Sequence, residues 1–127
     1  MDHDQPKNAN TWQGIFPVMN SGDDGFVGLA PSGCYAANAY GLYDMIGNVW
    51  ELTTDIYQPR HGETPGPDQM PMMGETKRYV IKGGSFLCAP NYCMRYRSGS
   101  REGQEADLAA SHLGFRTILR APREPGP

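Results

Sequence analysis

The chain has 127 residues, of which 39% are hydrophobic, and a formal net charge of −3 at pH 7. This length predicts a single domain over residues 1–127 with a modest hydrophobic core. The sequence shows no apolar run long enough for a membrane helix, no signal-peptide pattern at residues 1–6 and no continuous basic stripe. We therefore expect a cytoplasmic protein that binds neither membranes nor nucleic acid.

Glycine and proline, with 16 and 11 residues, predict many turns and little regular secondary structure. Residues 1–8 are polar, and we expect this end to fray. Turn-forming residues occur throughout positions 10–26, and the strongest loop signal is the stretch 20–25. Oxygen atoms of such a loop can bind a hard cation such as Ca²⁺, although the spacing differs from that of an EF-hand loop. An ordinary solvated loop is the alternative interpretation.

Residues 36–46 carry apolar side chains at helical spacing, which predicts one short helix that ends at Gly47. The side chains that this helix would bury are Leu42, Tyr43 and Ile46. Residues 49–54 alternate between apolar and polar side chains and predict a strand.

The segment 57–76 contains several prolines and predicts a surface loop. Its methionines 70, 72 and 73 would suit a copper relay beside a copper site, but gap-filling packing is the simpler interpretation. The remaining expected elements are a short helical turn at 102–110, a closing strand at 113–120 and a tail at 122–127.

Cys88 and Cys93 lie in the stretch 80–97, after a glycine pair and on either side of Pro90-Asn91. A turn at Pro90-Asn91 would fold the two thiols toward each other. Two thiols are a soft ligand pair, and no further cysteine or histidine pair completes a four-ligand zinc site. A two-coordinate Cu(I) site or a redox disulfide therefore fits better. A structural disulfide and two buried free cysteines are the alternatives.

The nearby arginines and the number of cysteines add two expectations, one about the acidity of Cys88 and Cys93 and one about Cys34. Arg95, Arg97 and Arg101 would lower the thiol pKa values if they lie near the sulfurs in space. Because the chain has three cysteines, a disulfide within the chain leaves one of them over. Cys34 is expected to be that residue, with a structural rather than a catalytic role.

The cysteine stretch and two upstream segments resemble the formylglycine-generating enzymes, the family of sulfatase-modifying oxidases. In the cysteine stretch the matching residues are Gly83-Gly84-Ser85, Cys88, Tyr92-Cys93 and Arg95-Tyr96-Arg97, followed by Leu113-Gly114-Phe115-Arg116. The upstream matches are residues 10–14 with 24–26, and residues 40–51. The resemblance extends in one unbroken order from residue 9 to residue 120 and corresponds to the C-terminal part of the family domain.

The resemblance implies the α+β sulfatase-modifying factor fold, a relative of the C-type-lectin-like fold with little regular secondary structure. It implies a copper-dependent oxidase that uses molecular oxygen to convert a cysteine of a sulfatase-type protein to Cα-formylglycine. The implied substrate segment is an extended Cys-x-Pro-x-Arg peptide. A chain that supplies the missing N-terminal part of the domain is a further implied partner.

The resemblance also implies catalytic roles for individual residues. Cys88 and Cys93 would hold Cu(I) and admit the substrate cysteine as a third thiolate. Ser85 and Tyr92 would offer hydroxyl groups to the reaction, and Trp50 would keep the pocket dry.

The family pattern further implies two calcium sites. The ligands of the first would be the side chains of Asn10 and Asp24 and the carbonyls of Thr11 and Phe26. The ligands of the second would be the carboxylates of Asp44 and Glu51 and backbone groups of Gly47 and Val49.

Two other functions are compatible with the same fold. Non-catalytic binding modules and inactive paralogues are expected to lack one or both active-site cysteines, whereas this chain has both. Iron-dependent sulfoxide synthases need a histidine cluster, whereas His3, His61 and His112 lie in a tail, a proline-rich loop and a polar segment.

Overall fold

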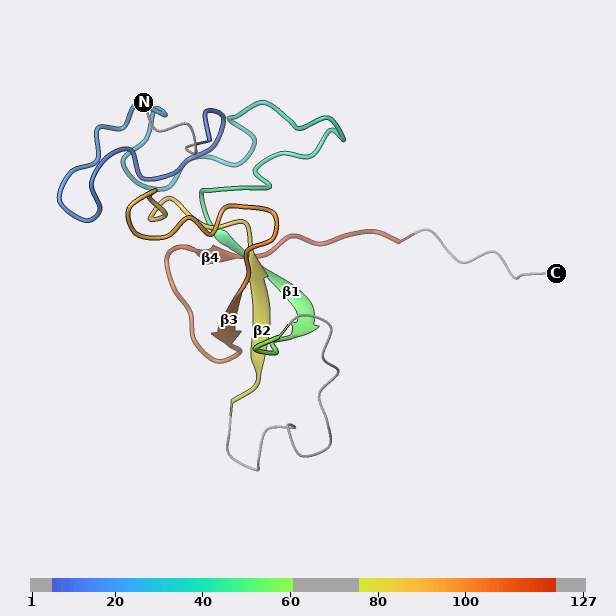
Figure 1. Ribbon diagram of the computed structural model, residues 1–127. Coiled ribbons are helices and arrows are strands. Elements are labelled where there is room, and N and C mark those ends of the chain that lie inside the picture. Colours follow the sequence, from blue (N-terminus) through green and yellow to red (C-terminus); the bar gives the residue numbers. More distant parts are fainter. Residues whose placement is uncertain (1–5, 61–75, 121–127) are drawn as a thin grey trace.

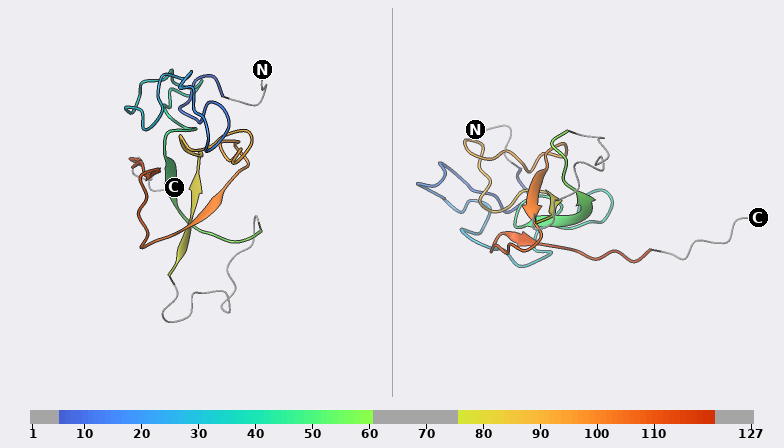
Figure 2. Two further views of the ribbon diagram at one scale, coloured as in Figure 1. Left: turned by 90° about the vertical axis from the view of Figure 1, so that its left-hand side faces the viewer. Right: turned by 90° about the horizontal axis from the view of Figure 1, so that it is seen from below.

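The computed structural model describes residues 6–60 and 76–120, which form one four-stranded sheet with long irregular segments at one end (Figure 1). The strands are β1 (Trp50–Ile56), β2 (Arg78–Lys82), β3 (Glu102–Glu105) and β4 (Leu113–Gly114). Their order across the sheet is β3-β2-β1-β4. The segments 6–49 and 83–100 gather where β1 begins and β2 ends (Figure 2, left).

The antiparallel pair of β1 and β2 forms the centre of the sheet, with Leu52 opposite Ile81. Val80 and Ile81 are both buried, and β-branched side chains of this kind suit a central strand. On the outer sides, β3 runs antiparallel to β2, and β4 pairs in parallel with the start of β1 through Trp50 and Leu113. The predicted strand at 49–54 is thus confirmed as β1.

A small core joins the cysteine stretch to the sheet, and its buried residues are Trp50, Ile81, Cys88 and Tyr96. Gly84 lets the chain turn back over the sheet at this point, with φ of 72°. A Cβ at position 84 would lie 3.0 Å from the backbone nitrogen of Tyr96. The close approach of two backbone segments, together with the left-handed conformation, therefore requires glycine.

The helix predicted at residues 36–46 is wrong, because this segment is a series of turns and bends. The Asn38 side chain accepts the backbone N–H groups of Tyr40 and Leu42 at 2.9 and 3.0 Å. Such an Asx-type turn competes with helical hydrogen bonding. Of the side chains expected to be buried, Leu42 and Tyr43 are 46% and 50% exposed, and Ile46 packs against the core.

Two predictions near the C-terminus are also corrected. Residues 102–105 form a strand instead of a helical turn, because they pair with β2. This pairing joins residues far apart in the sequence, so a local sequence pattern could not indicate it. The predicted strand 113–120 is limited to Leu113–Gly114.

The described ranges 6–60 and 76–120 contain strands and irregular structure and no helix, so the helical part of the predicted α+β class is not found there. Accordingly, no helix that could cross a membrane occurs in that part of the chain. The methionine cluster and most of the predicted loop 57–76 lie outside the described residues, as do most of the predicted frayed N-terminus and the tail.

Candidate active site

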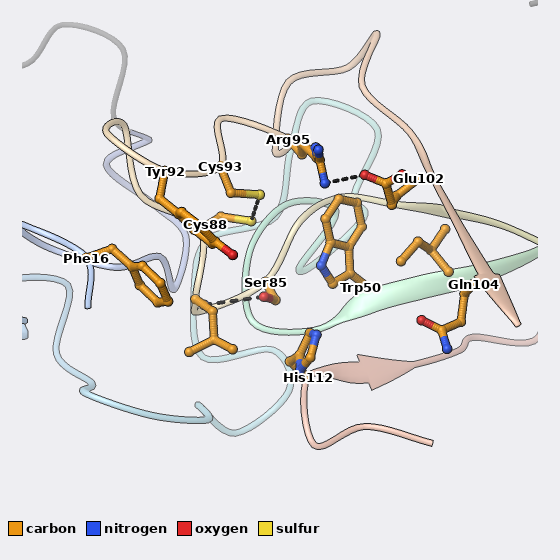
Figure 3. A pocket seen from close by; sticks show the side chains of 12 residues that line it. Phe16, Trp50, Ser85, Cys88, Tyr92, Cys93, Arg95, Glu102, Gln104 and His112 are labelled. Atoms are coloured by element: carbon orange, nitrogen blue, oxygen red, sulfur yellow. Dashed lines mark hydrogen bonds and ion pairs between the residues drawn. The ribbon is translucent and has the colours of Figure 1, made fainter. Parts of the chain in front are cut away.

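A cavity of about 410 Å³, which we call the cysteine cavity, lies between the start of β1, the N-terminal loop 12–19 and the segment 83–97 (Figure 3). The segment 83–97 carries Cys88 and Cys93, and we call it the cysteine loop. All five residues predicted to be catalytic line this cavity. The lining residues are Phe16, Trp50, Ile81, Ser85, Leu87, Cys88, Tyr92, Cys93, Arg95, Glu102, Gln104 and His112.

Two consecutive turns bring the sulfurs of Cys88 and Cys93 together. The backbone N–H of Cys88 donates to Ser85 O at 2.9 Å, and that of Cys93 donates to Ala89 O at 2.9 Å. The two Sγ atoms lie 2.8 Å apart, and both thiols are free. This separation exceeds the bond length of a disulfide, about 2.05 Å. The two cysteines therefore form a facing thiol pair, as the turn between them predicted.

The two thiols share one hydrogen bond and differ in acidity. The hydrogen bond with Cys88 lowers the pKa of Cys93 to about 6, and the backbone N–H and guanidinium of Arg95 assist. The same hydrogen bond, together with burial, raises the pKa of Cys88. Cys93 is half-buried, whereas Cys88 is 2% exposed. The more accessible sulfur of the pair is therefore the one that carries the negative charge near neutral pH.

The predicted arginine effect arises from Arg95, whose guanidinium forms an ion pair with Glu102 across the cavity. Arg101 instead lies over the ring of Tyr57, 4.9 Å from its centroid. The negative charge of Glu102 has the opposite effect and raises the pKa of Cys93. The ion pair thus links the cysteine loop to β3 beside the sulfurs.

The other three predicted residues surround the thiols. Ser85 is 1% exposed and its hydroxyl accepts the Leu87 N–H at 3.3 Å. Trp50 is 6% exposed, and its backbone N–H donates to His112 O at 2.8 Å. Tyr92 is 68% exposed at the side of the cavity that faces solvent.

Sequence reasoning missed Phe16, Glu102, Gln104 and His112 as residues of this cavity. Glu102 and Gln104 reach it because β3 pairs with β2, and His112 because the chain passes Trp50 just before β4. These pairings join residues far apart in the sequence, so no local pattern could have indicated them. Arg95, by contrast, was expected near the sulfurs, because it lies two residues after Cys93 in the sequence.

The first predicted calcium set comes together around the carboxylate of Asp24. One oxygen accepts the Thr11 N–H at 2.8 Å, and the other accepts the Phe26 N–H at 3.1 Å. Asn10 is buried beside them, but its amide donates to Gly28 O and to Asn48 Oδ1. These N–H donors therefore orient the carboxylate, and the oxygen that accepts the Phe26 N–H keeps a lone pair for a cation.

The second predicted set lines another cavity of about 420 Å³, which we call the Arg116 cavity. Asp44, Gly47, Val49 and Glu51 all border it. Both carboxylate oxygens of Glu51 are bound by Arg116, with Nε 2.5 Å from Oε2.

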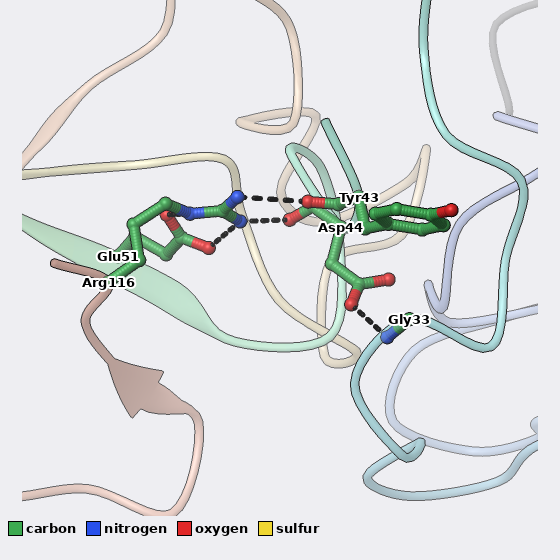
Figure 4. A network of polar contacts seen from close by, with 5 residues as sticks. All are labelled: Gly33, Tyr43, Asp44, Glu51 and Arg116. Atoms are coloured by element: carbon green, nitrogen blue, oxygen red, sulfur yellow. Dashed lines mark hydrogen bonds and ion pairs between the residues drawn. The ribbon is translucent and has the colours of Figure 1, made fainter. Parts of the chain in front are cut away.

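The same guanidinium also holds the loop before β1 (Figure 4). It donates to Tyr43 O at 3.0 Å and to Asp44 O at 3.2 Å. The Asp44 carboxylate in turn accepts the Gly33 N–H at 2.6 Å. As it stands, this arrangement does not fit calcium, because an internal cation neutralises Glu51. Within residues 6–60 and 76–120, no group of three or more His, Cys, Asp or Glu side chains is arranged to hold a metal.

Comparison with known proteins finds a matching family and several similar proteins for this chain. The sulfatase-modifying factor enzyme 1-like domain family matches residues 1–121. A formylglycine-generating enzyme of Mycobacterium tuberculosis is 47% identical over 117 residues, and one of Mus musculus is 48% identical over 117 residues. An inactive C-alpha-formylglycine-generating enzyme 2 of Mus musculus is 37% identical over 122 residues. Among solved structures, PvdO from Pseudomonas aeruginosa has a TM-score of 0.64 at 28% identity.

The matches cover most of this chain and a minor part of each relative. The alignments include 87%, 88% and 94% of the chain for the three sequences, but 39%, 31% and 35% of the relatives themselves. For PvdO the values are 86% of this chain and 38% of that chain. The chain thus spans less than two fifths of the length of these relatives.

Proposed function

Because the chain belongs to the sulfatase-modifying factor enzyme 1-like domain family, we propose that it takes part in oxidising a cysteine of a sulfatase-type protein to Cα-formylglycine. Molecular oxygen is the proposed oxidant. The proposed activity belongs to a protein that also contains the rest of the domain, in the same polypeptide or as a second chain. This part of the proposal follows from the share of the relatives that the chain spans, 39% in the Mycobacterium tuberculosis enzyme.

The observation that carries the proposal is the pair of free thiols 2.8 Å apart in the wall of the cysteine cavity. Cys93 is the more acidic and the more accessible of the two. A thiolate is both the nucleophile and the metal-binding form of cysteine. The pair can therefore hold a soft ion while a substrate thiol approaches from the cavity.

Two sulfur donors match the preference of Cu(I) for soft ligands. Copper bound there would supply a soft site for a third thiolate and electrons for the reduction of oxygen. Cys88 and Cys93 would hold the ion. The indole of Trp50 would limit the access of water, and the hydroxyls of Ser85 and Tyr92 would donate hydrogen bonds to reacting atoms.

The proposed substrate segment is an extended Cys-x-Pro-x-Arg peptide, and calcium at the Asp24 set is a proposed structural cofactor. Asp24 can keep the backbone N–H groups of Thr11 and Phe26 while an oxygen lone pair coordinates the cation. A chelator should then lower the melting temperature, because removal of a ligand present at 100 times its dissociation constant costs roughly 2.7 kcal/mol.

A copper titration followed by a peptide assay tests the proposed function. Cu(I) is titrated into the reduced wild-type chain and into Cys88→Ser and Cys93→Ser, and melting curves show that all three proteins are folded. A Cys-x-Pro-x-Arg peptide is then incubated in air with each protein, supplied together with the rest of the domain, and analysed by mass spectrometry. We expect one-to-one copper binding and formylglycine product with the wild type and with neither variant. A folded, reduced wild type that binds no copper would refute the oxidase.

The alternative is a non-catalytic binding module, and an inactive paralogue is among the relatives. The two free cysteines that face each other favour catalysis over this alternative. A chain that binds the peptide equally well with and without copper and never changes its mass would support the binding module.

A further inference from the structure

Tyr92 is an exposed residue on a turn, yet its proposed role requires a defined orientation. Its side chain is 68% exposed, and an exposed tyrosine on a loop ordinarily samples several rotamers. In Figure 3 the side chain extends from the cysteine loop into the cavity, with its oxygen at the inner end.

Phe16 lies against the Tyr92 ring. The two ring centroids are 4.3 Å apart and the planes meet at 15°, a stacked arrangement. The edge of Phe16 also contacts Trp12, at 4.9 Å and 72°. Aromatic rings in such pairs attract each other beyond the burial of their surface. Phe16 therefore restricts Tyr92 from one face and is itself restricted by Trp12.

Asn91 fixes Phe16 relative to the cysteine loop. Its amide oxygen accepts the Phe16 N–H at 3.3 Å, and its amide nitrogen donates to Phe16 O at 3.3 Å. Nearby, the backbone N–H of Trp12 donates to Cys88 O at 3.0 Å. The loop 12–19 is thus joined to the cysteine loop by three hydrogen bonds and one ring stack. These contacts connect residues about 75 positions apart.

We propose that Phe16, held by Asn91, is a positioning residue that orients the Tyr92 ring so that its hydroxyl points into the cysteine cavity. The catalytic consequence rests on the proposed function, whereas the orientation itself does not. Phe16 needs no contact with the substrate for this role. Its ring acts through Tyr92.

The first test measures the orientation without any reaction. The Tyr92 ring protons are identified in the NMR spectrum of the wild type as the signals that Tyr92→Phe removes. Because a stacked ring shields its neighbour, these signals should lie upfield in the wild type. Phe16→Leu removes that shielding whatever the Tyr92 rotamer, so the orientation is measured from the Hα–Hβ coupling constants of Tyr92. These should show one χ1 rotamer in the wild type and in Phe16→Tyr, and an average over several in Phe16→Leu. If Phe16→Leu keeps the single rotamer, the proposal is overturned.

The second test is a double-mutant cycle on peptide oxidation. Phe16→Leu should reduce kcat by roughly 3- to 10-fold, the factor that corresponds to one aromatic pair, with a smaller change in KM. In the Tyr92→Phe background the same substitution should have no further effect on kcat, because the hydroxyl that it orients is gone. Asn91→Ala should shift kcat in the same direction, and Val18→Ala, on the same loop and 82% exposed, should not.

An equal loss of kcat in both backgrounds would overturn the proposal, since it would show that Phe16 supports the loop without acting through Tyr92. A wild type that shows the single Tyr92 rotamer but oxidises no peptide would refute the proposed function alone. In that case the NMR result still supports the orientation of Tyr92 by Phe16.

Discussion

Replacement of Arg116 by glutamine should destabilise the fold measurably, because this side chain joins the segment after β4 to the loop before β1. It binds both oxygens of Glu51 and the carbonyls of Tyr43 and Asp44. The Arg116 and Glu51 side chains are 36% and 21% exposed, so solvent screens their attraction. We therefore count the ion pair at about 1 kcal/mol. Each hydrogen bond to a carbonyl adds about 0.5 kcal/mol.

The sum predicts a loss of roughly 2 kcal/mol, which for a chain of 127 residues lowers the melting temperature by roughly 7 °C. Thermal melts and urea unfolding of Arg116→Gln measure it. Arg120→Gln is the matched control, because Arg120 is exposed on the same segment and its loss should change stability by less than about 0.5 kcal/mol. A melting temperature for Arg116→Gln within about 2 °C of the wild type would refute the reasoning.

The same variant tests the relation between Arg116 and calcium. In the wild type the guanidinium occupies Glu51, so a cation has to displace it. Calcium should therefore raise the melting temperature of Arg116→Gln more than that of the wild type. An equal rise in both proteins would show that Arg116 does not compete for Glu51.

Three further predictions concern reactivity and packing. The pKa of Cys93 is lowered to about 6, so its alkylation by iodoacetamide should stay fast above pH 6 and become slower below it. Peptide mapping measures the alkylation rate of Cys93 at each pH, and a midpoint of the rate near pH 8.5, the ordinary pKa of a thiol, would contradict this. Gly47→Ala should cost roughly 2 to 4 kcal/mol in urea unfolding, because φ is 74° and the added Cβ would lie 3.0 Å from the Asn10 carbonyl carbon. Gly33→Ala, with φ of 77° and no neighbour within 4 Å, should show the backbone cost alone. Cys34→Ser should leave Cu(I) binding by calorimetry unchanged, since Cys34 is exposed and lies outside the cysteine cavity; loss of copper binding would mean that the metal ligands are misassigned.

Local chemistry sufficed to predict the turns and the facing thiols. Pro90-Asn91 and the glycine pair act over a few residues, and the alternation in β1 is a property of the strand itself. The predicted helix at 36–46 failed because the Asn38 side chain bonds to nearby N–H groups, a competition that hydrophobic spacing does not register.

The residues missed in the cysteine cavity were missed for a different reason. Glu102 and His112 reach it through pairing of strands and segments that are distant in the sequence, and neither carries a local signal. Likewise, Glu51 and Arg116 are 65 positions apart, and neither hydrophobic spacing nor the family pattern indicated their ion pair. Periodicity can indicate an element, but not its partner.

The start of β1 serves two cavities at once, because successive side chains of a strand point to opposite faces. Trp50 borders the cysteine cavity and Glu51 the Arg116 cavity. A slip of β1 by one residue would therefore exchange them, turning a carboxylate toward the sulfurs and an indole toward a guanidinium. Both exchanges are costly, since a buried charge would lose its partner and a cation its counter-ion. The ion pair on one face thus helps to fix the register of β1 that places Trp50 beside the thiols on the other face.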